Sequence, residues 1–339
     1  MKISSLRFGS HRILSIFALT AAVLAPFGLR AAPGDLFASV HHATSRLSDD
    51  AIFQFTPTGG QSTFLAGLKQ ARGLAFDSSG NLFVATTPVI LYGGTVLSSG
   101  TIFKVTPDGT PSTFANFDSN FFIEGLAIDS ANNVFAAAFF SVPADPNSEL
   151  INNFHSPADP GLAIGSHSKG SMIFKFTRSG RQSVFAVIDG RCFGLALDAD
   201  GNLYAAAGDV QTIYKFTSLG RKDTFVGPSA FSVAQFPFGL AFDSSGNLFV
   251  STQGNPGSDA ILKFSPAAAE NTFATGLSNA RALTFDNAGN LFVAELSDVG
   301  FVTTGGTILE FAPSGGQTVF ATGIGFSFPG GPEFLTFER

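Results

Sequence analysis

The stretch GLAFDSSGNLFV at residues 73–84 occurs again, letter for letter, at residues 239–250. Weaker copies of it lie between and after these two, so the chain repeats one motif several times. Five full copies can be aligned, and they read GLAFDSSGNLFVA (73–85), GLAIDSANNVFAA (125–137), GLALDADGNLYAA (194–206), GLAFDSSGNLFVS (239–251) and ALTFDNAGNLFVA (282–294). Such internal repetition is typical of proteins in which each copy builds one structural unit.

A second motif alternates with the first along the chain. One copy, GTIFKVTPDGTPSTF, occupies residues 100–114, and five others begin at residues 50, 171, 211, 259 and 306. In each motif two short apolar segments flank a turn, such as Asp-x-x-Gly-Asn in the first and Thr-Pro-x-Gly in two copies of the second, and these residues favour tight reversals. Each motif therefore predicts a β-hairpin, and one copy of each predicts a unit of four short antiparallel strands.

The sixth copy of the first motif is divided between the two ends of the chain. Residues 334–338 match the GLAFD half, and residues 34–38 match the GNLFV half. We therefore expect the C-terminal segment to be the innermost strand of a unit whose other three strands come from the N-terminus. Six such units predict an all-β fold, a six-bladed β-propeller with its ring closed by pairing of the N- and C-terminal segments.

The first residues have the features of a secretory signal peptide. Three basic residues precede an apolar run at 13–25, which is too short to span a bilayer and is followed by small residues. We expect residues 1–31 to be removed by cleavage after Ala31, and residues 32–339 to form a single propeller domain. The protein is then expected to be secreted or periplasmic, as a monomer without a membrane anchor.

Charge and cysteine content exclude some classes of function. The formal net charge is −6, and loss of residues 1–31 removes four cations and no acids, which gives −10. Nucleic-acid binding needs clustered Lys and Arg, so we expect no nucleic-acid partner. The single cysteine, Cys192, excludes internal disulfides, and we interpret it as a small buried hydrophobe rather than a nucleophile.

Pieces such as GLAFDSSGNLFVSTQGNPGSDAILKFSP (239–266) resemble an NHL repeat, and more broadly the propellers of the gluconolactonase/senescence-marker superfamily. The resemblance covers essentially the whole chain after residue 31. It implies the propeller fold but no single activity, because such propellers serve as lactonases, lyases and binding modules for RNA or protein. One feature departs from NHL repeats, which carry an Asp just after the second strand. In this chain that place is held by Val40, Thr86, Ala138, Ala207, Thr252 and Glu295.

The two faces of the ring are expected to differ. The turns inside the hairpins are short and stereotyped, whereas the links between second and third strands and between blades vary in length. The links at 86–99 and 295–305 are long, and an insertion at 138–170 is longer still. We call the face with the variable links the top face and the opposite face the turn face. Binding usually resides in variable loops on a constant scaffold, which favours the top face.

Two groups of polar residues have both a functional and a structural interpretation. The histidines after residue 31 all fall on the top face, and they are His41, His42, His155 and His167. They could be metal ligands or acid–base groups, but their spacing matches no compact zinc motif, and polar residues collect in loops in any case. The Asp-x-x-Gly-Asn turns could be calcium loops, but they contain too few carboxylates for a calcium cage. We favour the structural interpretation of both groups.

Six positions define the mouth of the central channel on the top face. They directly precede the GLAFD-type segments and are, in ring order, Glu333, Arg72, Glu124, Phe193, Phe238 and Arg281. The superfamily resemblance implies metal ligands at these positions, and Glu124 with its following glycine matches the Glu-Gly pattern of that family. The other positions lack the Asn or Asp that is typical, and arginines repel a divalent cation. We therefore expect no metal and no cofactor, but an arc of salt bridges opposite an aromatic wall.

The sequence leaves two functions open. The first is an exported NHL-like propeller that binds a small molecule or a protein at these six mouth residues on its top face, with no reaction of its own. The second is a lactonase-like hydrolase or lyase that has kept Glu124 and remodelled the rest of its site. No nucleophile elbow, zinc-protease motif or phosphate-binding loop is present in the sequence.

Overall fold

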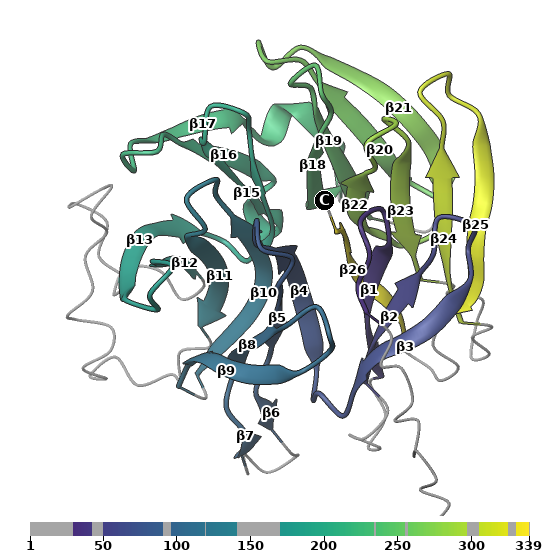
Figure 1. Cartoon of the computed structure of the whole chain (residues 1–339). Coiled ribbons are helices and arrows are strands. Elements are labelled where there is room, and N and C mark those ends of the chain that lie inside the picture. The colour runs from purple at the N-terminus through teal and green to yellow at the C-terminus, as the bar shows by residue number, and fades with distance from the viewer. Residues whose placement is uncertain are drawn as a thin grey trace, which may run out of the picture.

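The described part of the chain forms six four-stranded antiparallel sheets in a computed structural model, which confirms the predicted all-β propeller of six blades. The sheets follow one another around a ring, because the innermost strand of each contacts the innermost strands of its two neighbours (Figure 1). The structure describes residues 30–42, 50–90, 96–118, 120–140, 170–233, 235–254, 257–296, 305–324 and 330–338.

The strands of each blade follow one another from the channel outward, with the C-terminal strand innermost in blade one. Blade one contains β26 (Gly330–Phe337), β1 (Leu36–His42), β2 (Ala51–Phe55) and β3 (Gln61–Ala66). Blade two contains β4 (Ala71–Phe76), β5 (Leu82–Thr86), β8 (Thr101–Val105) and β9 (Pro111–Asn116). Blade three contains β10 (Phe121–Ile128), β11 (Val134–Phe140), β12 (Gly170–Phe176) and β13 (Gln182–Asp189).

The other three blades repeat this order without a break in the chain. Blade four contains β14 (Cys192–Leu197), β15 (Leu203–Ala207), β16 (Thr212–Phe216) and β17 (Lys222–Val226). Blade five contains β18 (Phe236–Phe242), β19 (Leu248–Gln253), β20 (Asp259–Phe264) and β21 (Glu270–Leu277). Blade six contains β22 (Ala280–Phe285), β23 (Leu291–Glu295), β24 (Gly306–Phe311) and β25 (Gln317–Ile324).

A few short elements lie outside the blades. The link expected at 86–99 contains a two-stranded hairpin of β6 (Val89–Ile90) and β7 (Val96–Ser98). Two short 3₁₀ helices, η2 (Gly208–Val210) and η3 (Pro228–Ala230), lie next to blades four and five. No helix among the described residues is long and apolar enough to cross a membrane.

The two ends of the chain close the ring, as the divided motif predicted. The pairing of β1 with β26 runs antiparallel from Leu36 opposite Phe337 to His42 opposite Gly330. Figure 1 shows the yellow strand β26 beside the purple strand β1. Beyond the strands, the N–H of Glu338 donates to the carbonyl of Asp35 at 3.1 Å, which extends the pairing by one residue. Blade one therefore has the same four strands as the other blades, with β26 in the innermost place.

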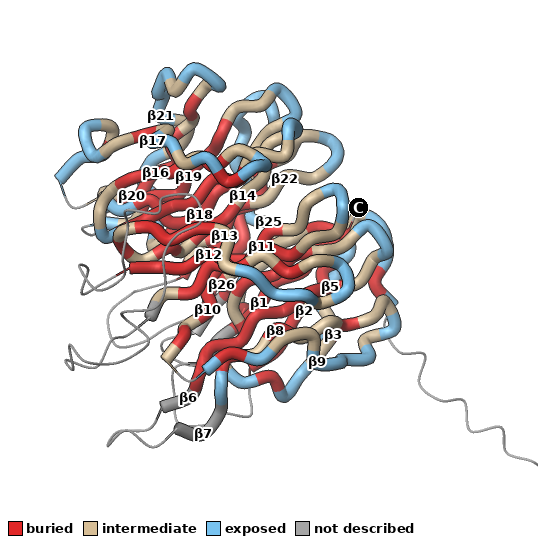
Figure 2. The backbone as a smooth tube through the Cα atoms, turned by 90° about the vertical axis from the view of Figure 1, so that its left-hand side faces the viewer, coloured by how far each residue is buried: buried red, intermediate tan, exposed pale blue. Residues whose placement is uncertain are grey.

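Phenylalanine fills the space within and between the blades, which explains its abundance in the sequence. The aromatic residue of each second strand makes an edge-on contact with the phenylalanine of the outermost strand, at centroid distances of 4.9–5.1 Å in all six blades. Edge-on pairs stabilise a core beyond the area that they bury. Figure 2 shows the resulting pattern, with buried residues along the strands and exposed residues at the turns.

The glycine of the GLAFD motif is required because neighbouring blades approach each other closely at that point. A Cβ atom on Gly239 would lie 2.1 Å from the carbonyl oxygen of Arg281 in the next blade, and one on Gly73 would lie 2.5 Å from that of Glu124. Both separations are shorter than any van der Waals contact, so a side chain would force the inner strands apart. The identical twelve-residue copies thus occupy equivalent places in blades two and five.

The Asp-x-x-Gly-Asn turns hold their carboxylates with their own backbone. Asp77 Oδ1 accepts hydrogen bonds from the N–H groups of Ser79 and Asn81, both at 2.9 Å, and Oδ2 accepts one from Asn81 Nδ2. Asp243 makes the corresponding contacts in blade five. These turns therefore use the aspartate to fix the backbone, in agreement with the structural interpretation.

Some expectations concern residues outside the described ranges. β11 continues to Phe140 and β12 begins at Gly170, so most of the insertion expected at 138–170, with His155 and His167, lies outside the described residues. The same is true of residues 1–29, and the signal peptide therefore stays a prediction. His41 and His42 lie in the second half of β1.

Candidate functional site

β-Bulges in the innermost strands present the six mouth residues to the channel. In blade three Ile123 pairs with Ala138 and Leu126 pairs with Ala136, so Glu124 and Gly125 together face one residue of β11. A register shift occurs at the same place in the other five blades. A bulge leaves an extra residue unpaired and re-aims its side chain, which explains how one sequence position reaches the mouth in every blade.

Four of the mouth residues form a continuous chain of ion pairs. Arg281 Nη1 lies 2.6 Å from Glu333 Oε2, and Arg72 Nη1 lies 3.1 Å from the same oxygen. Arg72 Nε lies 3.9 Å from Glu124 Oε2, which joins blade two to blade three. Both glutamates are buried, with exposed fractions of 2% for Glu124 and 5% for Glu333. The structure thus brings the four charged residues together in the order expected from the sequence.

The other two mouth residues form the expected aromatic wall. The rings of Phe193 and Phe238 are stacked, with centroids 4.5 Å apart and an interplanar angle of 19°. The guanidinium of Arg281 lies 5.1 Å from the centre of the Phe238 ring, in a cation–π contact. The wall is therefore connected to the ion pairs at the blade five–blade six boundary.

A fifth charged residue, Arg191, enters the mouth and was not expected from the sequence. Its Nη2 lies 2.6 Å from Glu124 Oε1, and its guanidinium lies 4.9 Å from the centre of the Phe193 ring. Arg191 therefore connects the ion pairs to the aromatic wall on the other side, and the contacts run around the whole mouth. Its position two residues before Phe193, directly before β14 (Cys192–Leu197), is the signal that could have found it.

Arg191 also contacts an aromatic pair farther from the channel axis. Its guanidinium lies 4.0 Å from the centre of the Phe139 ring, and Phe139 is stacked on Phe122 at 4.8 Å. Phe122 precedes Glu124 by two residues, just as Arg191 precedes Phe193. A second layer of residues thus surrounds the mouth on the side of blades three and four.

The five charged residues of the mouth comprise three guanidinium groups and two carboxylates, and the buried carboxylate of Asp50 acts on Arg72 from outside this set. Arg72, Arg191 and Arg281 supply three guanidinium groups, against the two carboxylates of Glu124 and Glu333. Burial alone would lower the pKa of Arg72, but the negative charges of Glu124, Glu333 and Asp50 outweigh this effect and raise it. The guanidinium group of Arg72 is therefore charged at any physiological pH.

Each of the three mouth arginines has a buried N–H group that makes no hydrogen bond. The Nε atoms of Arg72, Arg191 and Arg281 are buried without a hydrogen-bond acceptor. The side chain of Arg191 is nevertheless 38% exposed, compared with 16% for Arg72 and 21% for Arg281. Arg191 is therefore the mouth arginine that an incoming molecule reaches most readily.

The donor set of the mouth does not fit the divalent metal that the superfamily resemblance implies. Its two carboxylates face guanidinium groups, and the four remaining predicted positions are arginines and phenylalanines. A metal cage needs several oxygen or nitrogen ligands and tolerates neighbouring cations poorly. Among the described residues, no group of three or more His, Cys, Asp or Glu side chains is close enough to hold a metal ion.

Cys192 lies beside the mouth but is not exposed to it. The side chain is buried, and its Sγ lies 3.7 Å from the carbonyl oxygen of Gly194. Burial, and to a lesser extent the charge of Glu124, raises the pKa of the Cys192 thiol. A protonated, buried thiol is a poor nucleophile, which agrees with its interpretation as a core residue.

Comparison with solved structures places this ring among known propellers. The chain is similar to a luciferin-regenerating enzyme, with 12% identity, a TM-score of 0.52, and coverage of 78% of this chain and 84% of that one. It is similar to a candidate gluconolactonase, with 15% identity, a TM-score of 0.51, and coverage of 78% and 87%. A virginiamycin B lyase from Staphylococcus aureus matches with 15% identity, a TM-score of 0.48, and coverage of 77% and 70%.

No protein-family model and no curated protein sequence matches the chain. At these identities, the structural likeness establishes the fold alone. That fold is the one that the resemblance to gluconolactonase-like propellers implied, and similar rings carry out different reactions. The function must therefore be argued from the mouth itself.

Proposed function

We propose that this protein binds a small molecule or a protein segment at the mouth of its top face, and that it has no reaction of its own. The observation that carries the proposal is the excess of guanidinium over carboxylate groups beside the stacked rings of Phe193 and Phe238. Fixed positive charge next to an apolar wall suits a ligand with an anionic group and an aromatic or acyl body. Residues 1–31 support export of this binding protein.

The ligand is oriented by its charge. Its anionic group accepts hydrogen bonds from Arg191, whose planar guanidinium presents donors in a fixed geometry that matches a carboxylate. Its apolar body then packs against Phe193 and Phe238. Each Å² of apolar surface that this contact removes from water contributes about 25 cal/mol to the free energy of binding. Arg72 and Arg281 hold Glu124 and Glu333 in place, so the site is formed before the ligand arrives.

Calorimetric titration with phenylacetate, and with hexanoate as the acyl probe, tests the proposal. We expect saturable binding of at least one anion and no binding of the uncharged analogue 2-phenylethanol. Arg191→Ala should weaken binding at least tenfold, because a hydrogen bond to a charged group is worth about 1.5–3 kcal/mol. Arg221→Ala is the matched control, since Arg221 is 78% exposed and pairs with Asp223 away from the mouth. Unchanged affinity in Arg191→Ala would contradict the proposal.

The second candidate is a lactonase-like hydrolase or lyase that acts at the same mouth. The position of Glu124 at a bulge before a glycine favours it, together with the likeness of the fold to a candidate gluconolactonase. In this case Glu124 must exchange its contacts with Arg72 and Arg191 for contacts with a substrate. A panel of small lactones, with and without added divalent metal, tests this candidate. If the protein turns over a lactone and Glu124→Gln abolishes this activity, the enzyme candidate replaces the binding proposal.

A further inference from the structure

The turn face repeats an arrangement in which a lysine ammonium lies beside a turn aspartate and over an aromatic ring. In blade two Lys104 Nζ lies 3.4 Å from Asp77 Oδ2 and 5.4 Å from the centre of the Phe83 ring. Blades three, four and five have the same arrangement, with ammonium–carboxylate distances of 3.5–3.8 Å and ammonium–ring distances of 4.9–5.0 Å. The residues are Lys175, Asp129 and Phe135; Lys215, Asp198 and Tyr204; and Lys263, Asp243 and Phe249.

The strand register places the lysine over the ring. In each of these four blades the lysine of the third strand is the cross-strand partner of the aromatic residue of the second. The aspartate comes from the turn that precedes that second strand. The fold therefore presents one carboxylate and one aromatic face to a cation at an equivalent point in each of these four blades.

Blade six keeps the aspartate and the ring but has a glutamate in place of the lysine. Asp286 accepts the usual turn hydrogen bonds, from the N–H groups of Ala288 and Asn290 and from Asn290 Nδ2. Phe292 occupies the position of the ring, and its cross-strand partner is Glu310. Blade six thus has two carboxylates, from Asp286 and Glu310, in the surroundings of the Phe292 ring, where four sister blades hold a lysine ammonium.

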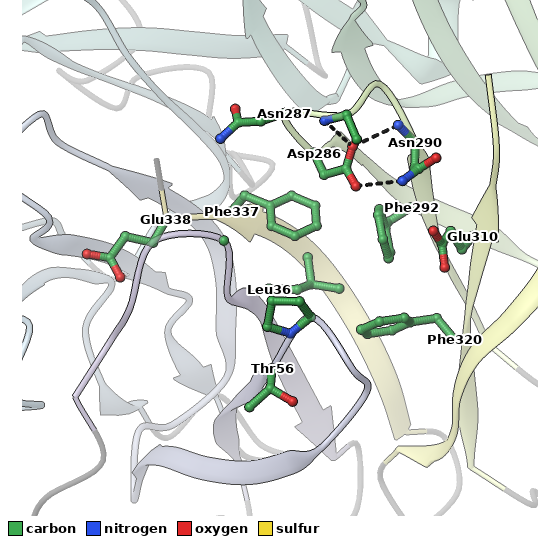
Figure 3. A pocket seen from close by; sticks show the side chains of 13 residues that line it. Leu36, Thr56, Asp286, Asn287, Asn290, Phe292, Glu310, Phe320, Phe337 and Glu338 are labelled. Atoms are coloured by element: carbon green, nitrogen blue, oxygen red, sulfur yellow. Dashed lines mark hydrogen bonds between the residues drawn. The ribbon is translucent and has the colours of Figure 1, made fainter.

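A cavity of about 280 Å³ lies at this point, between blades six and one. Figure 3 shows Asp286 on one side of the Phe292 ring and Glu310 beside that ring. Phe320 and Phe337 contact Phe292 edge-on at 5.0 Å, and they form the apolar part of the lining. None of the thirteen residues that line the cavity is a lysine or an arginine.

We propose that this cavity binds the ammonium group of a small aliphatic amine, which takes at blade six the place of the sister-blade lysine. The two carboxylates supply charge-assisted acceptors, and the face of Phe292 adds a cation–π contact. The alkyl chain of the ligand lies against Phe320 and Phe337. A volume of about 280 Å³ suits a molecule of a few heavy atoms, since a liquid water molecule occupies about 30 Å³. The site lies on the face opposite the mouth and is independent of the function proposed there.

Calorimetric titration of the full chain with 1,4-diaminobutane tests the proposal, with 1,4-butanediol as an uncharged probe of the same length. We expect saturable one-site binding of the diamine and none of the diol. The decisive variant is Glu310→Lys, which recreates the sister-blade arrangement and fills the site from within the chain. It should reduce diamine affinity at least tenfold and should raise Tm, because it restores the lysine–aspartate pair that blades two to five have. Its folding is checked by circular dichroism.

Two further variants sharpen the test. Glu310→Gln keeps the shape of the side chain and removes its charge, so it should also weaken diamine binding without adding a cation. Glu270→Lys is the matched control, because it makes the same charge change at an exposed position of β21 and should leave binding intact. Equal binding of diamine and diol, or full diamine binding by Glu310→Lys, would overturn the proposal. Binding of calcium chloride but not diamine at the same residues would overturn it as well.

Discussion

Arg281 Nη1 donates a hydrogen bond of 2.6 Å to Glu333 Oε2 across the boundary between blades six and one. Arg281 belongs to β22, the innermost strand of blade six. Glu333 belongs to β26, the C-terminal strand that completes blade one. One ion pair therefore belongs both to the candidate site and to the closure of the ring. Changes to this pair are expected to affect ligand binding and stability together.

Glu333→Gln is expected to lower the free energy of unfolding by about 1–3 kcal/mol, because the charge that faces Arg281 and Arg72 is lost from a buried position. Asp223→Asn should change stability very little, since Asp223 pairs with Arg221 at an exposed surface. Urea denaturation of both variants measures the difference. Equal effects of the two substitutions would show that the mouth ion pairs do not stabilise the ring.

Deletion of residues 332–339 is expected to destabilise the protein severely, because it removes most of β26 and exposes the apolar faces that Leu335 and Phe337 cover. A milder version of the test is Leu335→Ala, which should cost about 2–5 kcal/mol as a large-to-small change in the core. Leu219→Ala is the control, since that leucine is 96% exposed. Thermal denaturation is the measurement, and a deletion variant with unchanged Tm would contradict the closure of the ring by β26.

Gly239→Ala is expected to cost about 1–3 kcal/mol, as overpacking does, because the added Cβ would lie 2.1 Å from the carbonyl oxygen of Arg281. Gly316→Ala serves as the matched control, since a Cβ at that position meets nothing within 4 Å. The control should be neutral or slightly stabilising, because alanine restricts the unfolded chain more than glycine does. Chemical denaturation of the two variants compares them, and an equal response would remove the steric explanation of the repeated glycine.

Asp243→Ala is expected to destabilise the fold in a manner that depends on pH. Burial would raise the pKa of Asp243, but hydrogen bonds from Asn247 and Ser245 and the charge of Lys263 outweigh burial and lower it. A carboxylate with a lower pKa in the folded state stabilises the fold above its unfolded pKa of about 3.9, and this contribution is lost as pH falls through the folded value. The variant should therefore lose about 1–3 kcal/mol at pH 7 and less at pH 3.

Urea denaturation at the two pH values measures this dependence on Asp243. Asp200→Ala is the control, because Asp200 is exposed in an equivalent turn of blade four. It should change stability little at either pH. A loss in Asp243→Ala that is as large at pH 3 as at pH 7 would mean that the carboxylate acts through packing rather than through its charge.

Export can be tested on the protein itself. We expect N-terminal sequencing of protein from the secreted or periplasmic fraction to begin within a few residues of Ala32. Small residues around position 31 after an apolar run are the features that a signal peptidase requires. An intact Met1 on protein from the cytoplasmic fraction would contradict this expectation.

The repeated motif was sufficient to predict the blades, their number and the closure of the ring. Local turn residues and strand periodicity specify each hairpin, and the division of one motif between residues 34–38 and 334–338 leaves closure as the way to complete the sixth blade. The same repetition placed Arg72, Glu124, Phe193, Phe238, Arg281 and Glu333 at the mouth, because equivalent positions in a repeat have equivalent surroundings.

Two contacts between blades were decided only by the tertiary structure. Arg191 lies outside the six mouth positions, and its contact with Glu124 depends on the reach of a long side chain from blade four toward blade three. The cavity beside Glu310 depends likewise on Phe337 of blade one, whose ring packs against Phe292 of blade six. Sequence periodicity reports which face of a strand a residue occupies, but the distance between side chains of neighbouring blades is set by the twist, the bulges and the packing of the closed ring.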